Sequence, residues 1–143
     1  MPAPHPPPLM FVDWAGPVVA AGIFVVLMGL VREPLRRTVN AIIVAGAIGA
    51  YISGGGFGIW EVAFPIVAMP FAFAGLHSYR SIAIAWFLHA GWDFAHHLWG
   101  GPIWPFLPTS SFGCLVFDSL IAVWFLAGAP SMRARQRAGT PAA

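Results

Sequence analysis

The chain has 143 residues, enough for one domain, and 59% of them are hydrophobic whereas only 8% are charged. This composition is far from that of a soluble globular protein and is typical of a chain that folds in a lipid bilayer. The net charge of +2 comes from seven arginines in short clusters, with no lysine, which argues against nucleic-acid binding. The single cysteine, Cys114, lies in an apolar run and predicts neither a disulfide nor a thiolate metal site.

The first hydrophobic segment follows a proline-rich tail of residues 1–13. Because this tail lacks the positive charges of a secretory signal, we expect the segment, about residues 14–31, to be retained. It ends at a polar cluster that contains Arg32, Glu33 and Arg36. A second segment, residues 38–52, stops at three consecutive glycines, since glycine disfavours the helix.

Three further apolar segments follow, at about residues 59–76, 81–99 and 112–127. Pro65 and Pro70 predict kinks in the first of them, and a loop with three prolines separates the other two. Together the five segments predict an all-α transmembrane helix bundle with about five spans over residues 14–128. Residues 129–143 are expected to form an arginine-rich cytoplasmic tail.

The positions of the arginines predict the topology. If five spans alternate sides, the Arg32 cluster, Arg80 and the tail that carries Arg133 all fall on one face. The positive-inside rule makes that face cytoplasmic and leaves the N-terminus outside. We therefore expect a multi-pass protein of the inner membrane, with membrane lipids as partners and no nucleic acid. Either a homo-oligomer or a place in a larger membrane complex fits this pattern.

Ionisable residues gather in the fourth segment. His89, Asp93 and His96 have the spacing i, i+4, i+7, which places them on one helical stripe, and His97 lies at its edge. A charged group at the centre of a membrane helix costs roughly 2.5–3.5 kcal/mol, so such groups are expected to face protein or water. We predict these four side chains as metal ligands.

Two carboxylates from neighbouring segments are expected at similar depth. Glu61 lies near the start of the third segment, level with His96, and Asp118 lies in the fifth, level with Asp93, at ~1.5 Å of rise per residue. No arginine is expected at that depth. The carboxylates can therefore be neutralised only by protons, by histidines or by a bound cation.

Imidazole and carboxylate ligands together suit a divalent metal such as zinc, iron or manganese. An ion on the fourth segment that keeps an open position would activate a bound water molecule. Glu61 and Asp118 are then the predicted catalytic carboxylates, with one of them acting as general base. This interpretation predicts a metal-dependent enzyme that acts on a lipidic or otherwise apolar small molecule.

Three alternatives use the same residues. A proton relay, or a channel or transporter subunit, is the other common use of histidines and acids inside a membrane. A haem or pigment site is the second alternative, since Ala85, four residues before His89, leaves space beside an axial ligand. Polar side chains can also simply fix helix packing by hydrogen bonding to one another.

Two resemblances accompany these patterns. The stretch from residue 54 to 99, with GGGFGIWE and HAGWDFAHHLWG, resembles a family of small bacterial integral-membrane proteins of unknown function. More loosely, FAGLH ending at His77 and HAGWD ending at Asp93 resemble two motifs of the CAAX-protease and bacteriocin-processing family, with Glu61 in place of a third. That resemblance implies an intramembrane metal site. The paired glutamates and the arginine of that family are absent, so proteolysis is not implied.

Overall fold

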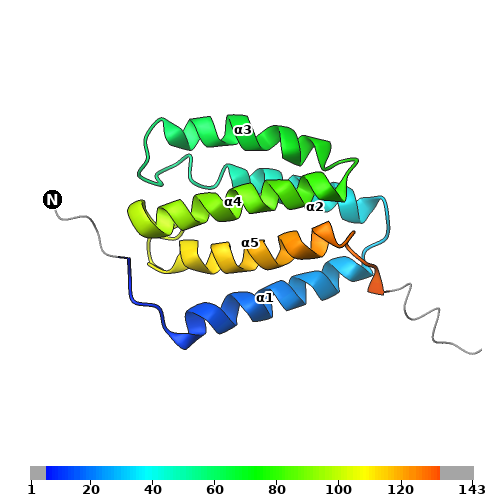
Figure 1. Ribbon diagram of the computed structural model, residues 1–143, viewed down its shortest axis with the longest axis horizontal. Coiled ribbons are helices and arrows are strands. Elements are labelled where there is room, and N and C mark those ends of the chain that lie inside the picture. The colour runs from blue at the N-terminus through cyan, green and yellow to red at the C-terminus, as the bar shows by residue number, and fades with distance from the viewer. Residues whose placement is uncertain (1–5, 133–143) are drawn as a thin grey trace, which may run out of the picture.

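The computed structural model describes residues 6–132, which form an all-α bundle (Figure 1). Its helices are α1 (Phe11–Leu30), α2 (Leu35–Ile48), α3 (Trp60–Ala74), α4 (Tyr79–Trp99) and α5 (Ser110–Leu126). Within the described residues there is no strand, so the all-α prediction is confirmed. The tail with Arg133, Arg135 and Arg137 lies outside the described residues.

Each helix coincides with one predicted segment, and the largest difference is at the end of the second, which stops at Ile48 rather than residue 52. There the N–H of Gly49 donates hydrogen bonds to the carbonyls of Gly46 and Ala47, and a series of turns leads to Gly54. The helix therefore ends before the three glycines that predicted a break, and Gly54 is the last residue of the turns. Pro65 and Pro70 are accommodated inside α3.

Only α1, among the described helices, is long and apolar enough by itself to cross a bilayer. α3 and α5 are apolar but have 15 and 17 residues, about 22 and 26 Å at ~1.5 Å per residue, against ~30 Å of hydrocarbon. α4 has 21 residues, but its histidines and Asp93 lower its hydropathy. By length and composition, therefore, one candidate span is found among the described helices, and the predicted topology of five spans is not supported.

The helix α4 is the centre of the packing, and it contacts α2, α3 and α5, whereas α1 packs against α5. Small side chains make this central position possible, since Ala83, Ala85 and Ala90 on α4 let its neighbours approach closely. Apolar side chains such as Val44, Ile82 and Ile121 fill the remaining core. Polar side chains on α4 consequently meet residues from several helices at once.

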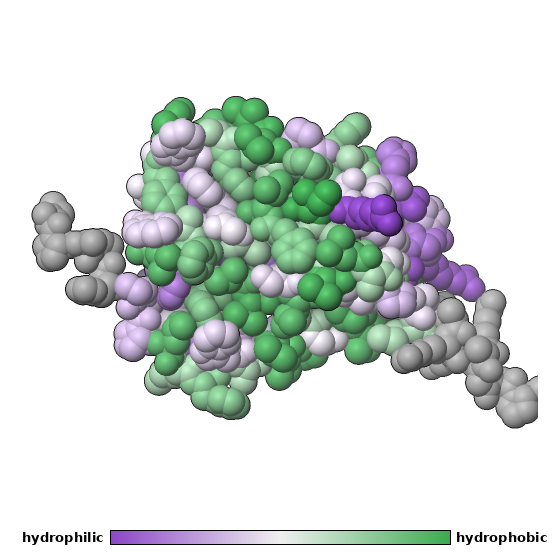
Figure 2. All heavy atoms as spheres, viewed as in Figure 1, coloured by the Kyte–Doolittle hydropathy of each residue, from purple (hydrophilic) through white to green (hydrophobic). Residues whose placement is uncertain are grey.

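The two ends of the bundle differ in composition. At one end, on the left of Figure 1, lie the glycine-containing segments 49–59 and 100–109, and we call it the glycine-loop end. At the other, which we call the arginine end, Arg36 on α2 makes a salt bridge of 2.8 Å to Glu33. Tyr79 hydrogen-bonds both of these residues. Figure 2 shows the most hydrophilic surface of this view at the arginine end and hydrophobic residues over the middle of the bundle.

Candidate functional site

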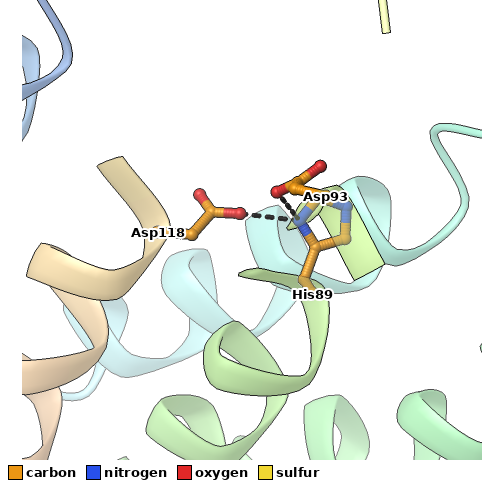
Figure 3. A group of neighbouring side chains, drawn as sticks. All are labelled: His89, Asp93 and Asp118. Carbon is orange, nitrogen blue, oxygen red and sulfur yellow. Dashed lines mark hydrogen bonds and ion pairs between the residues drawn. The ribbon is translucent and has the colours of Figure 1, made fainter. Parts of the chain in front are cut away.

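Three buried side chains meet where α4 packs on α5 (Figure 3). Nδ1 of His89 lies 2.6 Å from Oδ2 of Asp118 and 3.2 Å from Oδ2 of Asp93. The three residues are at most 3% exposed, and one ligand atom of each lies within 4.8 Å of the others. We call His89, Asp93 and Asp118 the inner cluster.

The positions of these residues follow from the helices. His89 and Asp93 are one turn apart on α4, so their side chains project from the same face. Asp118 lies near the middle of α5, and Ala122 beside it is fully buried, so the two helices approach closely there. The expected proximity of Asp118 to the stripe of α4 is found.

Two hydroxyl groups extend the inner cluster, and the sequence analysis did not identify them. The hydroxyl of Tyr51, in the turn after α2, donates a hydrogen bond of 2.7 Å to Oδ1 of Asp93. It also lies 2.9 Å from Oγ of Ser111, in the first turn of α5. A search for charged residues overlooks both because neither side chain is charged. Their positions along the bundle axis could have identified them, since Tyr51 follows α2 and Ser111 lies in the first turn of α5, both near the glycine-loop end, as His96 is.

The charges of the inner cluster do not balance. Two ionised carboxylates beside a single imidazolium would leave one net negative charge among residues that are at most 3% exposed. The arginines of the described chain belong to the arginine end and do not compensate for it. The cluster therefore needs one further proton or a bound cation, because an unpaired buried charge is strongly unfavourable.

A second acid–histidine contact, which we call the outer pair, lies nearer the glycine-loop end. Nε2 of His96 is 2.9 Å from Oε1 of Glu61, and Nδ1 of His96 is 2.9 Å from the carbonyl oxygen of Trp92. The backbone N–H of Phe57 donates a hydrogen bond of 3.0 Å to the same glutamate oxygen. The ring of Tyr51 stacks on His96 with 3.6 Å between centroids, so Tyr51 contacts both groups.

The structure does not bring together all four ligands predicted on α4: His89 and Asp93 lie in the inner cluster, and His96 and His97 do not. His96 shares the stripe of His89, but seven residues of helix place it roughly 10 Å further along the axis. It pairs with Glu61 instead, as its depth predicted. His97 points elsewhere, with its ring 5.2 Å from that of Phe112 and its Nδ1 without a hydrogen-bond partner.

The residues of the CAAX-protease resemblance do not come together. Glu61 is in the first turn of α3, whereas His77 lies in the turn that follows its last residue, so the helix separates them. His77 is exposed, while Asp93 is buried in the inner cluster. The geometry gives this resemblance no support.

The inner cluster could hold a metal ion. Its ligands are imidazole and carboxylate, the donors that zinc, iron and manganese accept. Oδ2 of Asp93 lies 3.2 Å from Nδ1 of His89 but makes no hydrogen bond, so its lone pairs are free for an ion. Ligands about 2.0–2.2 Å from a tetrahedral ion lie roughly 3.3 Å from one another, so the 2.6 Å contact of His89 with Asp118 would have to lengthen slightly on binding.

The comparisons with known proteins place the chain without giving it an activity. Neither a curated protein nor a solved structure matches it. A family model does, over residues 12–131, which include all of α2 to α5 and all of α1 except Phe11. The expectation of an uncharacterised family is thereby confirmed, and the chain belongs to the family of unknown function DUF6010.

Proposed function

We propose that this chain is a multi-pass membrane protein. The support is its surface, where large apolar side chains on three helices face outward, with Phe11 at 85%, Phe73 at 72% and Val123 at 58% exposure. Contiguous exposed apolar surface of this kind is rare on soluble monomers. The helix α1 is apolar and largely unburied, unlike the core helix of a soluble protein. Short helices such as α3 can cross a locally thinned bilayer or extend their spans with interfacial residues.

Cysteine labelling tests this topology. In a Cys114→Ser background, we expect single cysteines at Arg32 and Arg80 to react with an impermeant maleimide only after the inner membrane is opened. A cysteine at Thr109, next to α5 at the glycine-loop end, should react in intact spheroplasts. Reaction of all three in intact spheroplasts, or release of the protein by alkaline carbonate, would refute the multi-pass topology.

We further propose that the inner cluster binds one divalent cation. The observation that carries this proposal is the charge imbalance of two buried carboxylates and one histidine. A divalent cation bound to a neutral His89 balances Asp93 and Asp118, so no unpaired charge remains in the core. Because the ligands are at most 3% exposed, the site admits an ion more readily than a lipid-sized substrate. Cation binding is thus the activity that we propose, and any enzymatic role would depend on it.

Metal analysis of purified protein tests this proposal. After dialysis against zinc in detergent, we expect about one tightly bound ion per wild-type chain by elemental mass spectrometry. The double variant His89→Ala/Asp93→Ala should lose it. Asp118→Asn is the sharper variant, since it keeps the shape of the side chain and removes one charge. Equal zinc content in the wild type and in both variants would refute the proposal, and so would its absence from all three.

A proton relay is the second candidate, and one observation favours it. The contact of 2.6 Å between His89 and Asp118 is a hydrogen-bond distance, and Tyr51 continues the chain of hydrogen bonds from Asp93 to Ser111. Such a chain can pass protons between neighbouring groups. In proteoliposomes loaded with a pH-sensitive dye, this candidate predicts a proton flux that Asp93→Asn abolishes. The absence of flux from wild-type liposomes would exclude it.

A further inference from the structure

The outer pair is a second acid–histidine site that the inner cluster does not use. Glu61 and His96 belong to different helices, and both side chains are almost completely buried, at 5% and 0% exposure. We propose that Glu61 and His96 form a second, weaker divalent-cation site through which ions reach the inner cluster. This inference rests on the proposed function and adds a route by which the ion is loaded.

His96 is oriented as metal-binding histidines usually are. A carbonyl oxygen only accepts hydrogen bonds, so the contact of Nδ1 with the Trp92 carbonyl places a proton on Nδ1. In the neutral ring, the lone pair then lies on Nε2 and points at Glu61. Ligating histidines commonly donate their other N–H to a backbone carbonyl in this way, which fixes the tautomer and the ring orientation.

Glu61 contributes a carboxylate that is not saturated. Its Oε1 accepts the N–H of Phe57 and faces His96, whereas its buried Oε2 has no hydrogen-bond partner. With Nε2 of His96 unprotonated, the contact of 2.9 Å requires a shared proton or a cation between the two groups. A divalent ion replaces that proton and gives the unpartnered oxygen a ligand role.

A pocket at the glycine-loop end reaches His96, one member of this pair. His96 and His97 both line it, together with Gly100 and several prolines. Two protein side chains leave most coordination positions of an ion unfilled, and water from the pocket can occupy them. The outer site is therefore expected to bind more weakly and exchange faster than the closed inner cluster.

Gly55 covers the pair on its other side. A Cβ atom at this position would lie 2.3 Å from Oε1 of Glu61 and 2.4 Å from Nε2 of His96, the two atoms that would bind the ion. The loop is fixed there, because the N–H of Gly101 donates a hydrogen bond of 2.7 Å to the Gly55 carbonyl. A methyl group at residue 55 would thus obstruct the site without changing any charge.

Tyr51 lies between the two proposed sites. Its ring stacks on His96, and its hydroxyl donates to Asp93. An ion that leaves the outer pair for the inner cluster must pass this side chain, so rotation of the Tyr51 ring is the expected gate. The order of loading then runs from the pocket to the outer pair and from there to the inner cluster.

Zinc titration of the full chain in detergent tests the inference. We expect two ions per wild-type chain, one tight and one at least tenfold weaker. Glu61→Gln, which keeps the shape of the side chain, should retain the tight ion and lose the weak one. Gly55→Ala should do the same, while Gly91→Ala, whose added methyl meets open space on α4, should keep both. Stopped-flow zinc uptake into the tight site should slow at least tenfold in Glu61→Gln.

The outcomes separate this inference from the function on which it rests. A single tight ion in the wild type, with the same uptake rate in Glu61→Gln and Gly55→Ala, would overturn the outer site and leave the inner cluster standing. No bound zinc in the wild type would overturn both. If Glu61→Gln fails to fold, as judged by circular dichroism and gel filtration, Gly55→Ala beside Gly91→Ala decides the result.

Discussion

The arginine end and the inner cluster both contain buried or half-buried ionised groups, but they neutralise them differently. At the arginine end, Arg36 provides a permanent positive charge to Glu33, and Tyr79 adds a hydrogen bond. In the inner cluster, Tyr51 also adds a hydrogen bond, but the one cationic partner available to Asp93 and Asp118 is His89. The charge at the arginine end is therefore set by the chain itself. The charge of the inner cluster depends on what it binds, which is the property expected of a functional site.

Removal of His89 should give the largest loss of stability and so sharpen this comparison. His89→Leu leaves two buried carboxylates without a positively charged partner, and breaking such a contact costs about 3–5 kcal/mol. We expect a loss of this size in the free energy of unfolding, measured by denaturation in mixed micelles. His97→Leu is the matched control, since its ring lies half-buried at the pocket and should cost less than about 1 kcal/mol. Equal effects of the two substitutions would contradict a special role for the inner cluster.

Removal of the Tyr51 hydroxyl should have the next largest effect. Tyr51→Phe deletes the hydrogen bond to Asp93, with an expected loss of about 1.5–3 kcal/mol in the free energy of unfolding. Because this hydroxyl orients a ligand, zinc affinity should fall about 10–100-fold. Tyr79→Phe, which removes a hydroxyl at the arginine end, should leave zinc affinity unchanged. A similar loss of zinc affinity in both variants would show that the hydroxyl acts indirectly.

Neutralisation of Glu33 should have a smaller effect. Glu33 is 42% exposed, so water already solvates its carboxylate and compensates for a lost partner. We expect Glu33→Gln to lower the free energy of unfolding by about 1 kcal/mol or less, and the loss should shrink further at high salt. A loss as large as that of His89→Leu would remove the difference between the two regions.

The smallest expected effect is a dependence on pH at the arginine end. Burial raises the pKa of Glu33, but hydrogen bonds from Tyr79 and Arg36 outweigh it and bring the pKa below the ordinary value of 4.5. Since the folded pKa is the lower one, the contribution of Glu33 is complete above about pH 5 and is lost as pH falls through the folded value. The difference in unfolding free energy between wild type and Glu33→Gln should therefore shrink below pH 4.5. A constant difference would show that the ion pair does not contribute.

The helices were predictable because long apolar runs with glycine and proline breaks are local signals. The depth of each residue along segments that alternate in direction also predicted that Glu61 lies near His96 and Asp118 near Asp93, as the structure shows. Two features could not be obtained in this way. The spacing of His89 and His96 predicts that both lie on one face of the helix. It does not predict that each would find different partners along that face, so residues expected in one site lie in two separate groups. Tyr51 lies in a turn whose path depends on packing against α4 and α5, which no local pattern encodes.

The contact of α1 with α5 has a consequence for how the protein is made. α1 is synthesised before the other described helices, but its packing partner α5 follows only after α2, α3 and α4. The inner cluster is likewise incomplete until Asp118 is synthesised, because His89 and Asp93 belong to α4, one helix before their partner. During synthesis, His89 and Asp93 are therefore without Asp118 until α5 has been added. A nascent chain that is stalled before α5 emerges should therefore be degraded by quality-control proteases faster than the full chain.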